Sequence, residues 1–518
     1  MEREHRADVL IVGGGLGGVA AALAVARLGL RALMTEETDW IGGQLTAQAV
    51  SAPDEHPWIE SFGATRSYQA LRAAIRRYYA DHYPLLPDRE RAYLNPGRGG
   101  VSRLCHEPRV GLAALEAMLA PHRAAGRVTV WTGWRVIATD VEHDRVRAVR
   151  VADRGGHTAV LHAPWVIDAT ECGDLLPLTG TEYVTGAESV TDTGEPHAAP
   201  TAAPQDMQSF TWCFVLDHRP GEDHTVPRPE GYDACLQAGH LSWVQPHPVT
   251  GEPRRYAMFP GEGDPSAYPL WTYRRILDRT QFAEGAFPSD LSLINWPQND
   301  YTGGSIIDVP AGERERALMG ARRLSLSLLH WLQTEAPRPD GGQGWPGLCL
   351  RPDATGTPDG LAMVPYVRES RRIVPVFRVL EQHIALQSRS DGRAEAFRDT
   401  AGIGLYRIDL HPAVHTARYI DLSCCPFQIP LGALLPARMR NLLAGCKNIG
   451  TTHITNGAYR LHPVEWNIGE AAGALAAFCE QHALPPHGVR ERAASLDAFQ
   501  AVLRRLGVPL EWPAAHAV

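Results

Sequence analysis

The chain has 518 residues, of which 44% are hydrophobic, and its formal net charge is −8. That length supports a large core and predicts two or three domains, and the absence of a long basic run argues against a nucleic-acid partner. No apolar run is long enough to span a membrane, and the charged start MEREHRADVL leaves no room for a signal peptide, so we expect a cytoplasmic protein without a membrane partner.

The first fifty residues predict a dinucleotide-binding βαβ unit. A short apolar strand at 9–12 is followed by three glycines in the spacing G-x-G-x-x-G, then by an Ala-rich helix and a second strand at 30–35. An acidic residue follows 18 positions after the last of these glycines, where a carboxylate accepts hydrogen bonds from a ribose. The contacts to phosphate and ribose are therefore assigned to Gly13, Gly15, Leu16, Gly17, Gly18, Glu36 and Glu37.

The rest of the chain alternates strands and helices around a loop-rich middle. The patterns predict helices at 66–83, 108–125, 271–283, 311–335, 464–482 and 490–506, and one that follows the segment MVPYVRESRRI within 363–389. They predict strands at 128–136, 146–151, 160–168 and 441–445, and a strand-like stretch at 409–435. Residues 185–310 are rich in Pro, Gly, Trp and Tyr, which indicates an inserted domain with aromatic walls.

Three separated blocks carry a family resemblance. They are the opening unit extended by TDWIGGQLT, the block WVIDATECGDLLPLTG, and the block that runs from Asn441 to Phe478. With these blocks and its RESRR segment, the chain resembles bacterial FAD-dependent oxidoreductases of the glutathione-reductase-like fold. The resemblance implies an α/β protein with bound FAD and a discontinuous Rossmann domain that carries an inserted α+β substrate domain. We expect domain limits at 1–184, 185–362, 363–488 and 489–518.

The resemblance also implies contacts to FAD. The loop of Gly42, Gly43, Gln44 and Leu45 is expected beneath the flavin, and Ala169, Thr170 and Asp174 beside the ribityl–phosphate part. Glu171 departs from the family pattern, because Gly is usual there. Val136 is expected at the adenine. Gly445, Asn448, Asn467, Ile468 and Gly469 are expected near the flavin, where a helix beginning near 466–469 would direct free N–H groups at the ring.

Residues near the ring that can move a proton are the catalytic candidates. His453, Asn456 and Arg460 lie in THITNGAYRLHP, and Arg371 lies in RESRR. His453 is the candidate general base, and a histidine that only supports the wall is the equally weighted alternative. The arginines bind a substrate carboxylate or form ion pairs with Glu369. Neighbouring residues on a strand face opposite ways, so we do not expect Cys105 and His106 to pair.

The sequence predicts one leading reaction and two alternatives. The leading prediction is removal of hydride from a C–H next to O or N of a small polar metabolite. The alternatives are reduction of an activated C=C, as in fumarate-reductase-like flavoproteins, and a flavin-carrying RNA-modification or electron-transfer protein. The sequence holds one dinucleotide fingerprint and no C-x-x-C pair. We therefore expect a small-molecule substrate, an unidentified electron acceptor or donor, no metal site, and a monomer or homodimer.

Overall fold

Five parallel strands form the central sheet. The computed structural model describes residues 3–247, 250–261 and 263–513. The strands lie in the order β24 (Leu442–Ala444), β8 (Trp165–Asp168), β2 (Val9–Val12), β3 (Ala32–Glu36) and β4 (Val128–Thr132). Their residues are almost all buried, as expected for a parallel sheet covered on both faces. The predicted strand at 441–445 is confirmed, and because it joins β8, a C-terminal strand completes an N-terminal sheet.

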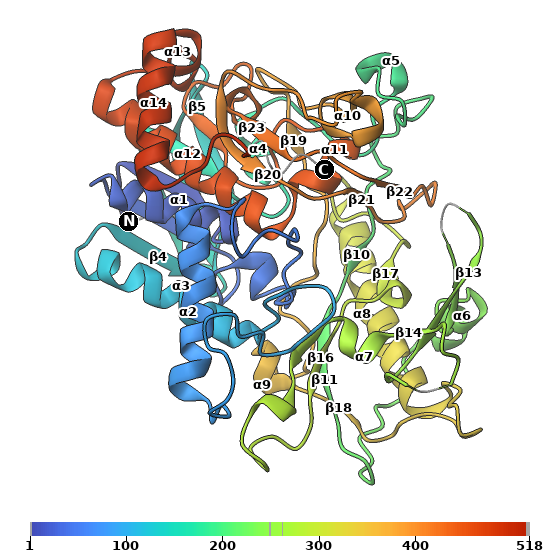
Figure 1. Ribbon diagram of the computed structural model, residues 1–518. Coiled ribbons are helices and arrows are strands. Elements are labelled where there is room, and N and C mark those ends of the chain that lie inside the picture. The colour runs from blue at the N-terminus through green and yellow to red at the C-terminus, as the bar shows by residue number, and fades with distance from the viewer. Residues whose placement is uncertain (1–2, 248–249, 262, 514–518) are drawn as a thin grey trace.

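Two Ala-rich helices pack against each other beside this sheet (Figure 1). They are α1 (Leu16–Arg27) and α12 (His462–His482). A Cβ on Gly469 would lie 1.9 Å from the carbonyl oxygen of Gly17, so only glycine allows this approach. The predicted start of the second helix is wrong by about one turn. Because α12 begins at His462, the N–H groups of residues 466–469 lie within the helix and are not its free first N–H groups.

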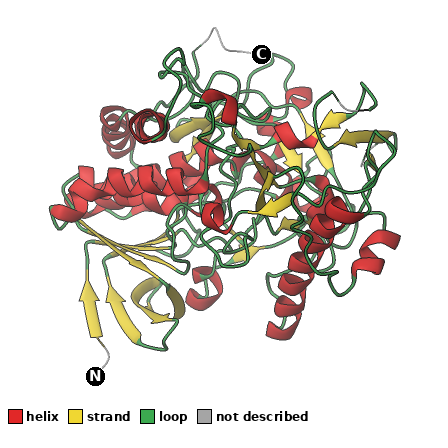
Figure 2. Cartoon of the chain, turned by 90° about the horizontal axis from the view of Figure 1, so that it is seen from below, coloured by secondary structure: helices red, strands yellow, loops and turns green. Residues whose placement is uncertain are grey.

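A second, four-stranded sheet follows the order β1 (Arg3–Arg6), β7 (Thr158–His162), β6 (Arg145–Asp153) and β5 (Trp134–Glu142). Figure 2 shows strands fanned out beneath the row of helices. The strands predicted at 128–136 and 160–168 are each two strands that belong to different sheets. Gly133, with φ of +76°, separates β4 from β5, and residues 163–164 separate β7 from β8. Helices α2 (Arg66–His82) and α3 (Pro108–Ala124) confirm their predictions.

The middle of the chain forms the green and yellow part of Figure 1. Its main sheet has the order β15 (Arg275–Leu277), β16 (Leu291–Ile294), β11 (Phe214–His218) and β18 (Leu348–Leu350). Smaller pieces are β9 (Tyr183–Val184), α4 (Leu175–Thr179), α5 (Val190–Thr193), β10 (Phe210–Thr211), α6 (Tyr232–Gln237), β12 (Val244–Pro246), β13 (Pro253–Ala257), β14 (Tyr268–Pro269), β17 (Asp300–Tyr301) and α9 (Pro352–Thr355). Helix α8 (Ala311–Thr334) confirms the predicted helix at 311–335. The helix predicted at 271–283 is wrong, because α7 (Leu270–Tyr273) ends where β15 pairs with β16.

The last third returns to the central sheet. It contains β19 (Arg372–Ile373), α10 (Glu381–Ile384), β20 (Thr400–Gly404), β21 (Ile408–Leu410), β22 (Ile420–Leu422), β23 (Phe427–Pro430), α11 (His453–Tyr459), α13 (Pro486–Glu491) and α14 (Ala493–Leu506), with 3₁₀ turns at Leu386–Ser388 and Leu431–Leu434. Earlier in the chain, 3₁₀ turns form at Gly43–Leu45, Arg279–Gln281 and Pro297–Asn299. The long helix predicted within 363–389 is wrong, since only α10 and one 3₁₀ turn form there. The stretch at 409–435 is three short strands, and the helix at 490–506 is two helices. The proposed domain limits stay a prediction.

Candidate active site

The carboxyl ends of four neighbouring parallel strands meet at one edge of the central sheet. Gly445, Ala169, Gly13 and Glu36 stand at the ends of β24, β8, β2 and β3. Ligands of open α/β sheets bind at this edge. A groove of about 430 Å³ lies there, and eight residues predicted from the sequence line it: Gly13, Glu36, Glu37, Val136, Ala169, Thr170, Asp174 and Arg371.

The glycines of the fingerprint leave room for a bound group at the start of α1. Gly13 has φ of +102°, and a Cβ on it would lie 2.2 Å from the carbonyl oxygen of Ala169. Gly15 and Gly43 face each other across a narrow gap, because a Cβ on Gly43 would lie 2.9 Å from the Cα of Gly15. Glycines at a helix N-terminus suit a pyrophosphate. The one side chain that the contacts of Gly15 and Gly43 share here is Glu171, whose Oε1 would lie 2.9 Å from a Cβ on Gly15 and 2.5 Å from one on Gly43. Leu16, Gly17 and Gly18 are the first residues of α1 and are buried.

The carboxylate of Glu36 is held by backbone and side-chain donors. Its Oε1 accepts from the N–H and the hydroxyl of Thr38, at 2.8 and 2.7 Å, and its Oε2 accepts from the N–H of Gly14 at 2.9 Å. One lone pair of Oε2 is left for a ribose hydroxyl. Burial raises the pKa of Glu36 to about 7, and neighbouring Glu37 adds to the shift. The side chain of Glu37 is exposed and lines the groove. The protein atoms that surround it reduce its hydration, and this raises its pKa too.

Three buried polar side chains, Lys447, Glu465 and Gln44, form a network with half-buried Glu171 beside the cradle. The ammonium group of Lys447 pairs with Glu171 and lies 4.0 Å from Glu465. Glu465 accepts from the N–H of Gly17 at 3.2 Å and from the amide of Gln44. The two carboxylates raise the pKa of Lys447 although burial alone would lower it. Sequence reasoning did not identify Lys447 or Glu465, because the lysine and Glu171 are 276 positions apart.

His453 begins α11 and is bonded to a carboxylate of the RESRR segment. Its Nδ1 lies 2.9 and 3.0 Å from the two oxygens of Glu369. Burial would raise the pKa of Glu369, but His453 and Arg372 hold it at about 2. An ionised carboxylate can only accept a hydrogen bond, so Nδ1 of His453 carries the proton in this contact. Nε2 is therefore the basic nitrogen, and within the described chain this buried atom has no hydrogen-bond partner.

Other polar groups around His453 are also buried and incompletely bonded. Considering the described residues alone, five such atoms have no partner: Gln44 Oε1, Gln48 Nε2, Ser370 Oγ, Asn456 Nδ2 and Arg460 Nε. Hydrogen bonds connect two parts of this set: Gln44 donates to the carbonyl oxygen of Arg460, and Gln208 joins Asn456 to Glu369. Buried polar atoms are rarely left unpaired in proteins, so this cluster fits the wall of a site for a bound group.

Comparison with known families decides which group that is. The family model described as FAD dependent oxidoreductase matches residues 8–503. The chain belongs to this family. It is therefore an enzyme, an FAD-dependent oxidoreductase, and the groove with its glycine cradle fits the FAD that the family uses. No curated protein matches the sequence.

Several solved flavoproteins are distantly similar. A geranylgeranyl bacteriochlorophyll reductase-like protein from Thermoplasma acidophilum is 11% identical over 97% of this chain and 84% of its own, with a TM-score of 0.34. A myxobacterial chondrochloren halogenase is 19% identical over 43% of this chain and 45% of its own, with a TM-score of 0.23. The glycerol-3-phosphate dehydrogenase of Bacillus halodurans complexed with FAD is 14% identical over 41% and 40%, with a TM-score of 0.25. The chain thus spans less than half of the halogenase.

The residues that the sequence predicts near the flavin differ in what they contact. Gly42, with φ of +107°, and Gly43, Gln44 and Leu45 form a buried turn against the cradle. Asn448 donates to the carbonyl oxygen of Asp168 at 3.0 Å. Asn467 is bonded to Ala401 and Ile403 of β20, Ile468 is buried within α12, and Gly469 packs on α1. The last three residues therefore have a packing function in this geometry.

Arg371 lies in the FAD groove and away from His453. Its guanidinium group bonds to Asp174 at 3.0 Å, to Asp308 at 2.9 Å and to the carbonyl oxygen of Cys172 at 2.8 Å. Asp174 is thus held at the edge of the groove by Arg371, and its contact with the ribityl–phosphate part stays a prediction. The catalytic candidates are divided, because His453, Asn456 and Arg460 lie on or beside α11 while Arg371 faces the nucleotide.

Two other buried histidines, His462 and His106, differ in how their nitrogens are bonded: both nitrogens of His462 have partners, whereas Nε2 of His106 has none among the described residues. His462 lies 3.2 Å from the N–H of Asp54 and 3.0 Å from the carbonyl oxygen of Val50, and burial lowers its pKa to about 4. His106 bonds to the carbonyl oxygen of Glu107 at 2.8 Å. Burial raises the pKa of Cys105 to about 12, which makes its thiol a poor nucleophile.

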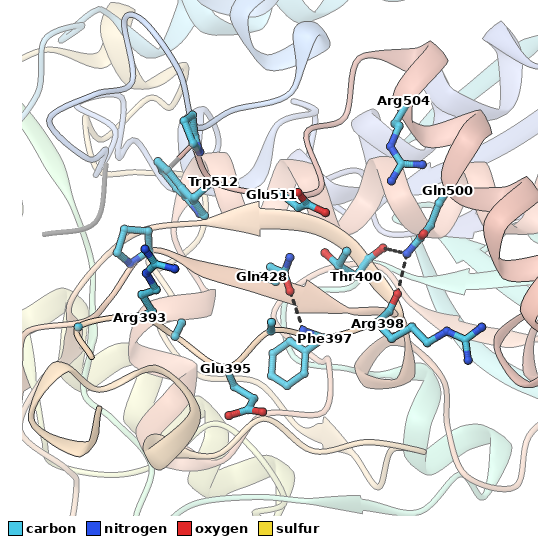
Figure 3. A pocket seen from close by; sticks show the side chains of 15 residues that line it. Arg393, Glu395, Phe397, Arg398, Thr400, Gln428, Gln500, Arg504, Glu511 and Trp512 are labelled. Carbon is cyan, nitrogen blue, oxygen red and sulfur yellow. Dashed lines mark hydrogen bonds between the residues drawn. The ribbon is translucent and has the colours of Figure 1, made fainter. Parts of the chain in front are cut away.

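A second cavity lies away from the FAD groove (Figure 3). It has a volume of about 530 Å³ and is bordered by residues 392–400, 426–428, 500–504 and the C-terminal segment at 511–513. Gln500 donates to the carbonyl oxygens of Arg398 and Thr400 at 2.9 and 3.1 Å. Among the described residues, none lines both cavities. No catalytic or cofactor residue predicted from the sequence borders this second cavity.

Proposed function

We propose that this FAD-dependent oxidoreductase removes hydride from a C–H next to O or N of a small polar metabolite. When bound, FAD supplies the acceptor for the hydride. The observation that carries the proposal is the pair of Glu369 and His453. Glu369 occupies Nδ1 of His453, while the buried Nε2 has no hydrogen-bond partner among the described residues and can act as the base. Nε2 takes the proton of the substrate's O–H or N–H, while ionised Glu369 holds the ring by its Nδ1–H.

The chain's residues also favour this direction over reduction of an activated C=C. The reverse reaction needs a proton donor, and Arg460 is the candidate for it. Tyr366 and Asp409 raise the pKa of Arg460 although burial would lower it, so its guanidinium stays charged and donates a proton poorly. The proposal includes a cytoplasmic location and a small-molecule substrate with a separate electron acceptor. Within the described residues, no helix has the length and apolarity that a membrane span requires.

Anaerobic single-turnover reduction tests the role of His453. We expect His453→Ala to slow substrate-dependent bleaching of the bound flavin by roughly a hundredfold or more, the scale on which a general base acts. The matched control is His487→Ala. It removes another buried histidine, whose Nε2 bonds to the carbonyl oxygen of Pro436, outside the groove. Wild-type bleaching in His453→Ala, with FAD bound, would show that the proposed base is wrong.

A further inference from the structure

A second cluster of charged and phenolic side chains adjoins the pair of Glu369 and His453. Asp300 on β17 lies 2.5 Å from Nδ1 of His411, and Asp409 on β21 lies 3.6 Å from its Nε2. The cluster therefore joins the middle of the chain to its last third. The side chains of His411 and Asp409 keep 28% and 22% of their surface accessible, although protein atoms surround both. Both side chains are therefore partly open to solvent while they lie among other residues.

Each arginine of this cluster is matched by its own aspartate. Arg274 pairs with Asp54 at 3.1 Å, Arg368 with Asp300 at 2.9 Å, and Arg460 with Asp409 at 3.4 Å. His411 lies between two of the same carboxylates. Burial and Arg368 lower its pKa, but Asp300 and Asp409 raise it further, so its net pKa is raised. The positive and negative groups thus neutralise one another almost completely.

Three tyrosines complete the wall. The guanidinium of Arg274 lies 5.1 Å from the ring of Tyr273, and that of Arg368 lies 4.9 Å from the ring of Tyr366. The hydroxyl of Tyr366 accepts from Arg460 at 2.7 Å and keeps its own proton to donate. Tyr406 lies in the segment between β20 and β21, three positions before Asp409; burial raises its pKa, and the charges of Asp54 and Asp409 add to the shift. Tyr273 and Tyr406 are half-buried.

The cluster is continuous with the parts of the site already described. The N–H of Gln208 donates to Glu369 at 3.0 Å, and its side-chain oxygen accepts from the N–H of His411 at 3.4 Å. The carbonyl oxygen of Arg460 accepts from Gln44 of the loop beside the FAD cradle at 3.1 Å. A molecule held by the tyrosines and aspartates would therefore lie next to His453 and next to the FAD groove.

We infer that this cluster is the substrate site and that its substrate is a neutral polyhydroxylated compound, such as a sugar or a polyol. The inference rests on the proposed function. A hydroxyl both donates and accepts, so it fits a wall that offers carboxylates, phenols and guanidinium groups together. A carboxylate or an amine would meet groups of its own sign that are already paired. Tyrosine rings offer a surface for the C–H face of a ring.

The reaction that follows is oxidation of an alcohol carbon to a carbonyl. The C–H bond breaks and its electron pair leaves as hydride to FAD, which is reduced. The O–H bond breaks and its proton passes to Nε2 of His453. The remaining electron pair of oxygen forms the second C–O bond. Asp409 and Tyr406 bind neighbouring hydroxyls and thereby orient the reacting carbon.

The test compares matched probes on the holoenzyme. Glucose and myo-inositol are the neutral probes, and gluconate and glucosamine are their charged counterparts. We expect the neutral probes to perturb the spectrum of oxidised flavin and to bleach it anaerobically. Asp409→Asn and Tyr406→Phe should each raise the KM for the neutral probe about tenfold, the scale of one lost hydrogen bond to a charged group. FAD content should not change, and kcat should change less than KM.

The control is Asp421→Asn. Asp421 is the register partner of Asp409 on β22, but it pairs with Arg407. Tyr406→Phe keeps the test valid if Asp409→Asn fails to fold. A preference for gluconate or glucosamine, or an unchanged KM in both variants, would overturn the inference. The proposed base and the proposed substrate class can be refuted separately. If neutral probes bind but His453→Ala bleaches normally, only the base is wrong. If His453→Ala is slow with a charged substrate, only the substrate class is wrong.

Discussion

Replacing Glu369 by Gln is the sharpest perturbation of the proposed base, because it keeps the volume and removes the charge. The two carboxylate oxygens accept from Nδ1 of His453, from Arg372 and from the N–H of Gln208. A glutamine has one oxygen and one NH₂ group, so its NH₂ must face at least one of these donors. Where it faces Nδ1 of His453, the imidazole takes its other tautomer, in which Nδ1 accepts and Nε2 carries the proton. His453 then cannot take a proton from the substrate.

The expected loss in the rate of flavin reduction follows from this geometry. We expect single-turnover flavin reduction to slow by roughly a hundredfold, which corresponds to about 2.7 kcal/mol of activation free energy. Stability should change as well. The pKa of Glu369 is lowered from 4.5 to about 2, which contributes about 3 kcal/mol to the free energy of unfolding above pH 4.5. That contribution is lost as the pH falls from 4.5 to 2, so the difference in stability between wild type and Glu369→Gln should be largest above pH 4.5 and should shrink towards pH 2.

Stopped-flow bleaching and thermal unfolding across pH measure the two effects. The matched control is Glu381→Gln, since Glu381 is also a buried carboxylate that holds a histidine, His197, at 2.7 Å. It should change stability but leave the bleaching rate within a few-fold of wild type. Equal bleaching rates in Glu369→Gln and wild type would refute the assignment of Nε2 as the base. A loss in Glu381→Gln as large as that in Glu369→Gln would show that the effect is only structural.

Three further predictions concern FAD and the helix pair. Gly15→Val should fold, because φ is −62° there, yet lose FAD, since a Cβ would lie 2.9 Å from the Glu171 carboxylate within the cradle; a normal ratio of flavin to protein absorbance would contradict this. Glu36 has a pKa of about 7 and accepts a ribose hydroxyl best when ionised. FAD should therefore dissociate more slowly as the pH rises from 6 to 8. Glu36→Gln should abolish this trend. A wild-type rate of FAD dissociation that is independent of pH would contradict the placement of the ribose. Gly469→Ala should lower the free energy of unfolding by about 1–3 kcal/mol or more, because its Cβ would overlap the Gly17 carbonyl at 1.9 Å. Its control is Gly488→Ala, where the nearest atom is 3.4 Å away, and equal melting temperatures would count against the packing argument.

The features that the sequence predicted well depend on short spacings. The fingerprint glycines and Glu36 occur within one βαβ unit, and helices α2, α3 and α8 end within one residue of their predicted limits. The errors arose where tertiary pairing overrode local pattern. The periodicity at 271–283 indicated a helix, but β15 at 275–277 pairs with β16 and ends it. The signals for the two divided strands were present as Gly133 and Pro164, since both residues interrupt regular structure.

The contacts within the candidate site are even harder to predict from the sequence, because they join residues that are far apart along the chain. His453 was found because it lies in a polar segment before a long helix, but its partner Glu369 lies 84 positions away. Asp300 and His411 are separated by 111 positions, and neither stands in a motif. One sequence contains no information on which distant charges meet, because a side chain's partner depends on how the sheets are connected. Arg371 illustrates this point, since its motif was identified but its position in the nucleotide groove was not.

The RESRR segment explains how one short stretch serves three parts of the site. Arg368 pairs with Asp300 of the tyrosine cluster, Glu369 holds His453, and Arg371 holds Asp174 in the FAD groove. Three neighbouring positions thus contact the substrate cluster, the base and the cofactor groove. Because the backbone fixes their separations, a shift of the segment would misplace all three groups together. The segment therefore fixes the proposed base and the proposed substrate cluster relative to the groove, through ion pairs that all arise within five residues.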